Sequence, residues 1–157
     1  MTMSKAANSR IYSEMPVEHL FTYEVDLDQK RIDCGPSGTK IHTLVTRGTF
    51  EGERLKGEIV VNHSFETAEV RSDGFITGDL RLWLRTNDGA DILMTYIATA
   101  VTIEGGMSVR NYPYFETAAE KYLWINKVQA VTLYDVKDGV LSPIDVYELP
   151  KPHWFGK

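Results

Sequence analysis

Three Asp-Gly pairs constrain the fold of this chain more than any other feature of its sequence. They occupy positions 73–74, 88–89 and 138–139, and each pair lies between two stretches that are rich in apolar residues. Asp and Gly tolerate the backbone angles that tight hairpin turns require. Three such hairpins predict strands that follow one another in antiparallel order, and therefore an all-β chain.

The stretches between these turns show the period of two that is typical of β-strands. Residues 91–103 are apolar on both faces, as expected of a central strand that is covered on both sides. Residues 78–86 alternate, with leucines 80, 82 and 84 on one face and Asp79, Arg81, Trp83 and Arg85 on the other. Residues 55–66 place a second set on one face: Leu55, Ile59, Val61, His63 and Phe65. Further strands are expected in 19–27, 41–50, 68–74, 127–136 and 140–149, for a total of about eight to ten.

One short helix is expected in the segment FETAAEKYLWIN, residues 115–126. Thr117 and Glu120 match the spacing of a capping box, in which each side chain bonds the backbone amide of the other residue. The following residues are good helix formers, so we expect a helix from Ala118 to about Trp124. The predicted fold is a single antiparallel closed β-barrel, with this helix closing one side or end. A barrel of about eight strands is just wide enough to hold one small ligand.

The length of 157 residues suits one domain. We expect a disordered leader at residues 1–12 and a barrel domain at 13–149. The C-terminal tail, 150–157, carries Trp154 and Phe155, which are expected to dock on the barrel or on a partner subunit.

The composition disfavours several classes of function. The net charge is −5 and there is no cluster of Lys or Arg, which argues against nucleic acid and anionic membrane surfaces as partners. A single cysteine, Cys34, fits a cytoplasmic location. The four histidines lack metal-ligand spacing and no phosphate-binding motif occurs, so we expect neither a metal nor a cofactor. The expected partners are a small molecule and a second copy of the chain, as a homodimer.

Several blocks of the sequence resemble the domain-of-unknown-function family 3237, over roughly residues 17–149. The blocks are Gly48-Thr49-Phe50 with Gly52 and Gly57, then Arg81 with Thr86 and Asp88-Gly89, then Phe115-Glu116-Thr117 with Tyr122, Trp124 and Asn126. The resemblance implies a small calycin-like or allene-oxide-cyclase-like barrel and no established family-wide reaction. The chain departs from the family at residues 62–66, where NHSFE replaces a Gly-Gly-x-Asp-Trp stretch and places His63 and Glu66 nearby.

His63 is the first candidate for chemistry, because histidine titrates near neutral pH and suits a general acid or base. The alternative is a core histidine that bonds a backbone group. Asp79, Arg81 and Trp83 share one strand face. In a cavity they could bind and polarise a carbonyl or phenolate. The three leucines of the opposite face favour a solvated outer surface instead, since turning leucines outwards is costly.

The helical segment supplies a second group of candidates. Glu116 would have a raised pKa in an apolar pocket and could act as acid or base, while Tyr122 and Asn126 could donate to an oxyanion. The alternative is structural, with polar groups at the helix ends and with Tyr122 and Trp124 in the core. Tyr96 is a further candidate, because alanines 98 and 100 on its face leave room for a ligand or for packing.

These residues suggest a cofactor-independent enzyme that acts on a small, largely apolar molecule, aromatic or polyketide-like. The reaction class is proton transfer: isomerisation, cyclisation, dehydration or a lyase step. In this hypothesis His63 or Glu116 is the acid or base. Arg81, Asn126 and Tyr96 stabilise negative charge, Trp83 and Trp124 stack on the ligand, and Asp79 and Tyr122 contact it. One alternative is a non-catalytic carrier or sensor of a hydrophobic ligand; another is a side-chain-filled barrel that serves only in assembly.

Overall fold

The computed structural model describes residues 14–150. The predicted leader and the docking of Trp154 and Phe155 lie outside the described residues. The strands are β1 (Glu18–Asp33), β2 (Thr39–Glu51), β3 (Lys56–Ile59), β4 (Phe65–Val70), β5 (Phe75–Thr86), β6 (Asp91–Ile103), β7 (Gly106–Asn111), β8 (Tyr114–Glu116), β9 (Ala130–Lys137), β10 (Val140–Leu141) and β11 (Ile144–Glu148). The described residues also form two short 3₁₀ helices, η1 (Gly35–Ser37) and η2 (Glu120–Lys127). No helix in the described part of the chain is long and apolar enough to span a membrane.

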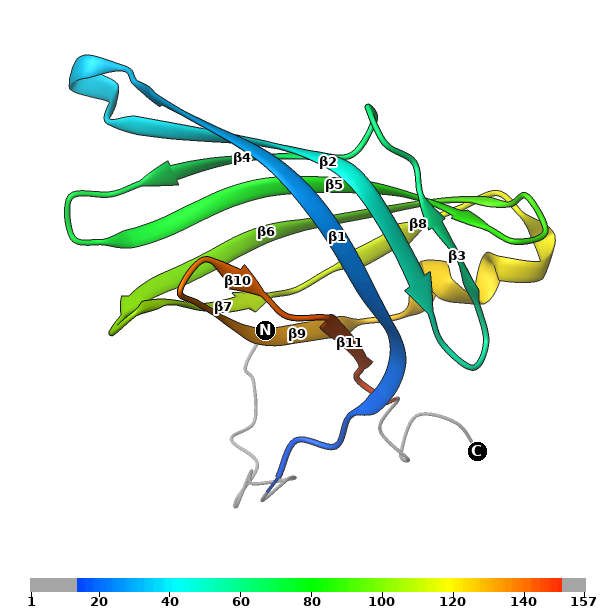
Figure 1. The fold of residues 1–157 in the computed structure, drawn as a ribbon. Helices are drawn as coiled ribbons and strands as arrows, with labels where there is room; N and C mark the ends of the chain where they lie inside the picture. Colours follow the sequence, from blue (N-terminus) through cyan, green and yellow to red (C-terminus); the bar gives the residue numbers. More distant parts are fainter. Residues whose placement is uncertain (1–13, 151–157) are drawn as a thin grey trace, which may run out of the picture.

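Eight of these strands close into an antiparallel barrel, as predicted (Figure 1). The order around the barrel is β1, β2, β4, β5, β6, β7, β9 and β11, and β11 pairs with β1 to close it. The short strands lie at the margins, where β3 pairs with β2 and β5, β8 with β6, and β10 with β9. The three Asp-Gly turns connect β4 to β5, β5 to β6 and β9 to β10, and their glycines have positive φ.

The segment 55–66 is not the single strand that its pattern predicts. Strand β3 ends at Ile59 and β4 begins at Phe65, with a turn between them in which Asn62 has a φ of 67°. Ser64 holds this turn, because its hydroxyl donates to the Val60 carbonyl at 2.9 Å and accepts the Trp83 amide at 2.9 Å. His63 is therefore exposed in the turn and does not share the apolar strand face on which we expected it.

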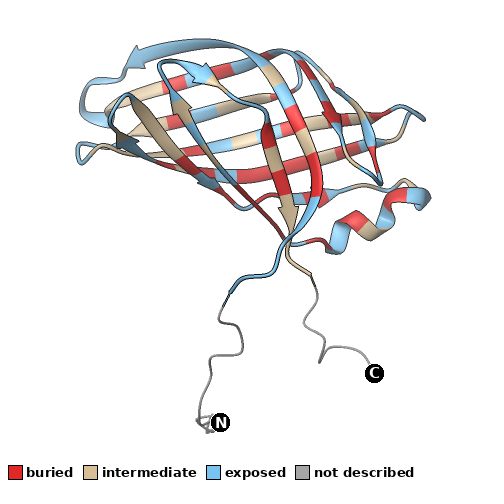
Figure 2. Ribbon diagram, turned by 60° about the horizontal axis from the view of Figure 1, so that its bottom comes forward, coloured by how far each residue is buried: buried red, intermediate tan, exposed pale blue. Residues whose placement is uncertain are grey.

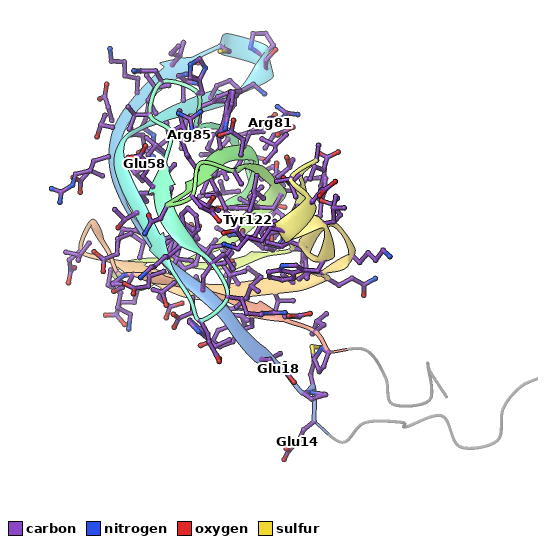
Figure 3. All side chains as sticks on the ribbon, turned by 90° about the vertical axis from the view of Figure 1, so that its right-hand side faces the viewer. Glu14, Glu18, Glu58, Arg81, Arg85 and Tyr122 are labelled. Carbon is purple, nitrogen blue, oxygen red and sulfur yellow. The ribbon has the colours of Figure 1, made fainter. Side chains whose placement is uncertain are left out.

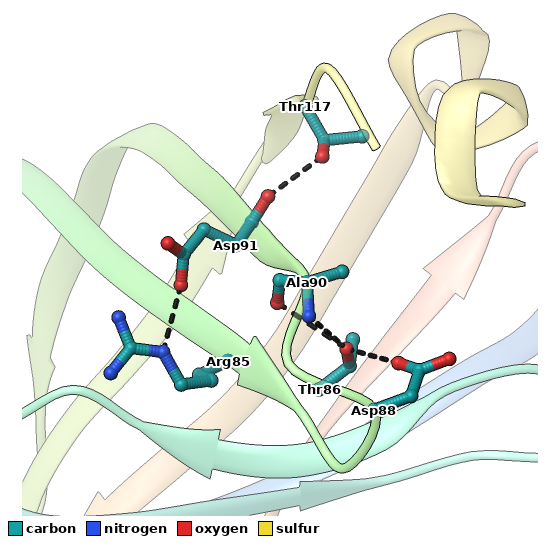
Figure 4. A network of polar contacts seen from close by, with 6 residues as sticks. All are labelled: Arg85, Thr86, Asp88, Ala90, Asp91 and Thr117. Carbon is teal, nitrogen blue, oxygen red and sulfur yellow. Dashed lines mark hydrogen bonds and ion pairs between the residues drawn. The ribbon is translucent and has the colours of Figure 1, made fainter. Parts of the chain in front are cut away.

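The helical segment also differs from its expected form. Helix η2 begins at Glu120, two residues later than predicted, and no side chain caps it. The Thr117 hydroxyl accepts the Ala119 amide at 3.1 Å and donates to the Asp91 carbonyl at 2.7 Å, a contact drawn in Figure 4. The Asn126 carboxamide bonds the amide and the carbonyl of Thr117, each at 2.8 Å. These bonds hold the segment in place of the predicted capping box.

Helix η2 is attached to the β5–β6 hairpin through Asp88. This carboxylate pairs with Lys121 and accepts the hydroxyls of Thr86, at 2.5 Å, and Tyr122, at 2.9 Å. The Lys121 ammonium and the two hydroxyls lower the pKa of Asp88. Figure 4 shows the Thr86–Asp88 contact and the neighbouring Arg85–Asp91 pair, 2.9 Å apart. The helix is therefore fixed over one end of the barrel.

The barrel is filled at the end that η2 covers. Phe21 lies fully buried there, with its ring centroid 5.6 Å from that of Phe50 and 6.0 Å from that of Phe115. Leu84, Ile92, Met94 and Ile125 are fully buried around them. Buried and exposed positions alternate along the long strands, as Figure 2 shows. The β1–β2, β4–β5, β6–β7 and β9–β10 turns lie at the opposite end of the barrel (Figure 1).

Candidate functional site

A cavity of about 360 Å³ occupies the half of the barrel that lies away from η2. A smaller hollow of about 40 Å³ reaches deeper, and both are bordered by Leu27, Thr43, Glu66, Tyr134 and Leu141. The larger cavity is otherwise mostly apolar, with Ile41, Ala68, Ile76, Ala98, Ala100, Met107, Val109 and Val136 along its wall. Its size and apolar lining are typical of sites for small organic ligands.

Small residues on three adjacent strands leave this space open. Ala68 of β4 pairs with Gly78 of β5, and Gly78 pairs with Ala98 of β6. Ala100 follows on the same face as Ala98. Protein interiors are otherwise close-packed, so a row of glycine and alanine across the wall produces a void that larger side chains would fill. The room that Ala98 and Ala100 were expected to leave beside Tyr96 is part of this cavity.

Glu66 is the acidic residue of the cavity wall. On β4 its register partners are Thr43 of β2 and Leu80 of β5, so its side chain points into the barrel. Burial raises the pKa of the Glu66 carboxyl, because a low dielectric disfavours the charged form. No described residue donates a hydrogen bond to this carboxyl or forms an ion pair with it. Its oxygens are thus available to a ligand.

Three tyrosines lie around the Glu66 carboxyl. The hydroxyls of Tyr23 and Tyr96 are 3.0 Å apart and bond to each other. Burial raises the pKa of both phenols, and it raises the pKa of Tyr134 to about 12, an effect that the neighbouring Asn111 amide partly offsets. The charge of Glu66 raises the pKa of all three further. The tyrosines therefore stay protonated near neutral pH and can donate hydrogen bonds.

Gly78 gives the Glu66 carboxyl its place in the wall. A Cβ added at Gly78 would collide with Glu66 Oε1 and would lie 3.2 Å from its Cδ. We predict that Gly78→Ala displaces the carboxyl and lowers the rate of any reaction that uses this carboxyl about 10²-fold, since small misplacements of a reacting group have effects of that size. Steady-state kinetics would measure this, with circular dichroism to show an intact fold. Unchanged turnover with a displaced Glu66 in a crystal structure would contradict the prediction.

Most residues proposed from the strand patterns lie outside the cavity. Asp79 and Arg81 form an exposed ion pair at 3.4 Å on the outer face of β5, and Trp83 lies half-buried on that face. Figure 3 places Arg81 at the outer edge of the barrel. His63 contacts Trp83 on this surface, with ring centroids 5.4 Å apart. The leucines of β5 face the barrel interior. This arrangement matches the alternative in which Asp79, Arg81 and Trp83 form an outer surface.

The residues of the helical segment lie at the closed end. Glu116 is exposed on β8, and Trp124 is half-buried with the Arg54 guanidinium 4.1 Å from its ring centroid. Tyr122 and Asn126 make the structural bonds described above, and Tyr122, labelled in Figure 3, also borders an open surface hollow. Within the described chain, Tyr96 is the predicted site residue that lines the cavity. The other predicted site residues do not line the cavity, and their roles remain predictions.

Pattern analysis did not single out Glu66, Tyr23 and Tyr134 as site residues. Treating 55–66 as one strand put Glu66 on the face opposite Phe65 and therefore on the polar side. The turn at 60–64 interrupts the strand that was expected over 55–66. Strand β4 starts after this turn and carries Glu66 and Ala68 on its inward face. A signal was present, because Glu66 belongs to the NHSFE stretch in which the chain departs from the related family.

The structure is a small closed antiparallel barrel with an internal, mostly apolar cavity. Residues 15–149 match the family described as "Protein of unknown function (DUF3237)", and the chain belongs to that family. The resemblance seen in the sequence blocks is thereby confirmed.

Solved structures share the fold. A protein of unknown function from Clostridium acetobutylicum is 22% identical, with a TM-score of 0.76, over 87% of this chain and 100% of that one. A β-barrel-like protein from Acinetobacter baumannii is 26% identical, with a TM-score of 0.69, over 85% of this chain and 92% of that one. An enzyme from Penicillium herquei is 22% identical, with a TM-score of 0.67, over 86% of this chain and 94% of that one.

One curated relative is described as an enzyme. It is the hydroalkoxylation enzyme phnH of Penicillium herquei, which is 31% identical over 102 residues. The match covers 62% of this chain and 59% of the relative, so the chain spans less than two thirds of that protein's length. Barrels of this kind thus include a protein with catalytic activity.

Proposed function

We propose that the protein is an enzyme that binds a small, largely apolar molecule in the barrel and moves a proton on it through Glu66. The observation that carries this proposal is the Glu66 carboxyl itself, which is half-buried in a mostly apolar wall, has a raised pKa and lacks a hydrogen-bond or ion-pair partner among the described residues. A carboxyl in such surroundings keeps its proton to a higher pH than a solvated one and can deliver it to a bound molecule.

The reaction class that we favour is the addition of a hydroxyl group across a carbon–carbon double bond. The relative with a named activity is a hydroalkoxylation enzyme, and hydroalkoxylation is this addition. It is a cyclisation when both groups belong to one molecule, and its reverse is an elimination. Both lie within the proton-transfer chemistry expected from the sequence.

Each step of this reaction balances with the groups that the cavity offers. Glu66 donates its proton to one alkene carbon, and the electron pair of the π bond forms the new C–H bond. The hydroxyl oxygen of the substrate attacks the other, electron-deficient carbon and forms the C–O bond. The hydroxyl proton returns to the Glu66 carboxylate, which restores the enzyme. The product is an isomer of the substrate, so no oxidant, reductant or cofactor is consumed.

The surroundings of Glu66 support this assignment. The mostly apolar wall offers water few hydrogen-bond partners, and water would otherwise capture an electron-deficient carbon. Tyr23, Tyr96 and Tyr134 provide hydroxyl groups that stay protonated and can orient the oxygen of the substrate. Dimerisation and a cytoplasmic location stay predictions from the sequence.

Deuterium incorporation tests the proposal. The purified protein would be incubated in D₂O with phenols that carry an ortho allyl or 3-methylbut-2-enyl group, after their binding has been measured by calorimetry. We expect a cyclic ether with one deuterium on the former alkene, delivered to one face and detected by NMR and mass spectrometry. Phenols that bind but gain no deuterium would contradict the enzyme and favour a carrier. A protein that binds none of them would favour a role in assembly.

A further inference from the structure

Two polar side chains are buried inside the barrel without a hydrogen-bond partner. Asn111 at the end of β7 is 0% exposed, and Thr132 on β9 is 1% exposed. They pair directly across the two strands, so their side chains are neighbours on the inner face. Neither the Asn111 carboxamide nor the Thr132 hydroxyl makes a hydrogen bond of normal geometry with a described group, although the carboxamide lies near enough to the Tyr134 hydroxyl to lower its pKa. We call this pair the polar recess.

The polar recess adjoins the cavity wall without lining it, and its polar atoms have almost no exposed surface, so a ligand oxygen reaches them only after a side-chain shift. Asn111 also pairs with Ala98 of β6, which lines the cavity. Thr132 precedes Tyr134 by two residues on the same face of β9, and Tyr134 lines both the cavity and its deeper extension. The pair thus lies one step further toward the packed end of the barrel than the cavity wall.

Burial without a partner has a physical consequence. A buried polar group that lacks a hydrogen bond destabilises the fold, and folded proteins satisfy nearly all such groups. A carboxamide offers both donors and an acceptor, and a hydroxyl offers one donor and two lone pairs. Side by side they match an uncharged oxygen group, either a hydroxyl or a carbonyl. No Lys, Arg or His among residues 14–150 lines the cavity, so an anionic group would lack a charged partner there.

We propose that Asn111 and Thr132 bind the neutral hydroxyl or carbonyl oxygen of the substrate, which enters the barrel oxygen first. The substrate class is then an uncharged, oxygen-bearing hydrocarbon whose apolar part lies against Ala98 and Ala100. This orientation brings the carbon skeleton beside Glu66 on β4. The inference rests on the proposed function, because it names the molecule that Glu66 converts.

Matched ligands test the recess without requiring any reaction. 1-Naphthol and 1-methylnaphthalene have nearly the same shape and differ by a hydroxyl in place of a methyl group. We expect the wild-type protein to bind the naphthol about 10-fold more tightly, as measured by equilibrium dialysis. Asn111→Leu and Thr132→Val should each remove most of that preference while leaving the affinity for methylnaphthalene nearly unchanged.

Thr95→Val is the matched control. Thr95 is another buried threonine, but it pairs with Arg81 on the outer face of the barrel and lines neither hollow. The preference for naphthol should persist in this variant. If Asn111→Leu fails to fold, the nearly isosteric Thr132→Val carries the test alone.

Three results would overturn the proposal. They are equal affinities for both ligands in the wild type, an unchanged preference in Thr132→Val, or binding of neither ligand below about 1 mM. An unchanged preference would indicate that an ordered water fills the recess. Glu66→Gln separates this inference from the proposed function, because it should keep the naphthol preference while deuterium incorporation is lost. A preference that depends on the recess, without any deuterium incorporation in the wild type, would reject the proposed chemistry alone.

Discussion

Replacing Glu66 by glutamine is expected to lower turnover by about 10²–10⁴-fold, the usual contribution of a positioned acid or base. Glutamine has nearly the size and polarity of a protonated carboxyl but cannot release a proton. Binding of an uncharged ligand should therefore change little, and the loss should appear in kcat. Stopped assays with an alkenyl phenol that the wild type converts would measure both parameters.

The same substitution has a predictable effect on pH dependence. The folded-state pKa of Glu66 lies above its ordinary value of 4.5, so protonation stabilises the fold and that contribution disappears as pH rises through the raised pKa. Wild-type turnover that depends on the protonated acid should fall over the same range above pH 4.5. The glutamine variant lacks this titration. At neutral pH it should unfold at a temperature at least as high as the wild type, which separates lost activity from lost structure.

Two controls complete the experiment. Glu69→Gln changes a carboxylate that lies on β4 but pairs with Lys40 at the surface, and it should keep full turnover. Glu116→Gln tests the residue that the sequence pattern favoured, and its exposure on β8 predicts little effect. A strong loss in Glu116→Gln together with an active Glu66→Gln would contradict the cavity as the catalytic site.

Phe21→Ala is expected to lower the free energy of unfolding by about 3–5 kcal/mol. The Phe21 side chain is fully buried at the packed end and contacts Phe50 and Phe115 in edge-to-face geometry. Truncation removes its apolar surface and leaves a void that the closed barrel cannot easily collapse. Urea denaturation followed by tryptophan fluorescence would measure the change. Folded proteins are typically stable by only about 5–15 kcal/mol, so a loss of this size would leave a large part of the Phe21→Ala variant unfolded if the wild type is near the lower end of that range.

Phe75→Ala provides the comparison. Phe75 lies partly exposed at the start of β5, beside Arg71, so the same truncation there should have a much smaller effect. Equal losses in the two variants would show that the end covered by η2 is not the main core of the barrel. A nearly neutral Phe21→Ala would lead to the same conclusion.

The parts of the fold that could be predicted depend on residues close together in the chain. An Asp-Gly pair forms its turn whatever lies elsewhere, and leucines 80, 82 and 84 share a face because strand geometry alternates. Two element boundaries were predicted wrongly, the break within 55–66 and the start of η2. Both depend on bonds to other strands. The Ser64 hydroxyl holds the turn at 60–64 by accepting the backbone amide of Trp83, which belongs to another strand. The 3₁₀ form of η2 likewise depends on bonds between Thr117 and both Asp91 and Asn126.

The sequence by itself determined the all-β class, the hairpins and the small residues beside Tyr96, because backbone preference and alternation act over a few positions. Only the tertiary structure decided which polar groups meet. Tyr23 and Tyr96 bond to each other across 73 positions of sequence, and Glu66, Tyr134 and Asn111 come from three further strands. Their convergence depends on the register of every strand pair around the closed barrel. A shift of one residue would turn Glu66 to the outside.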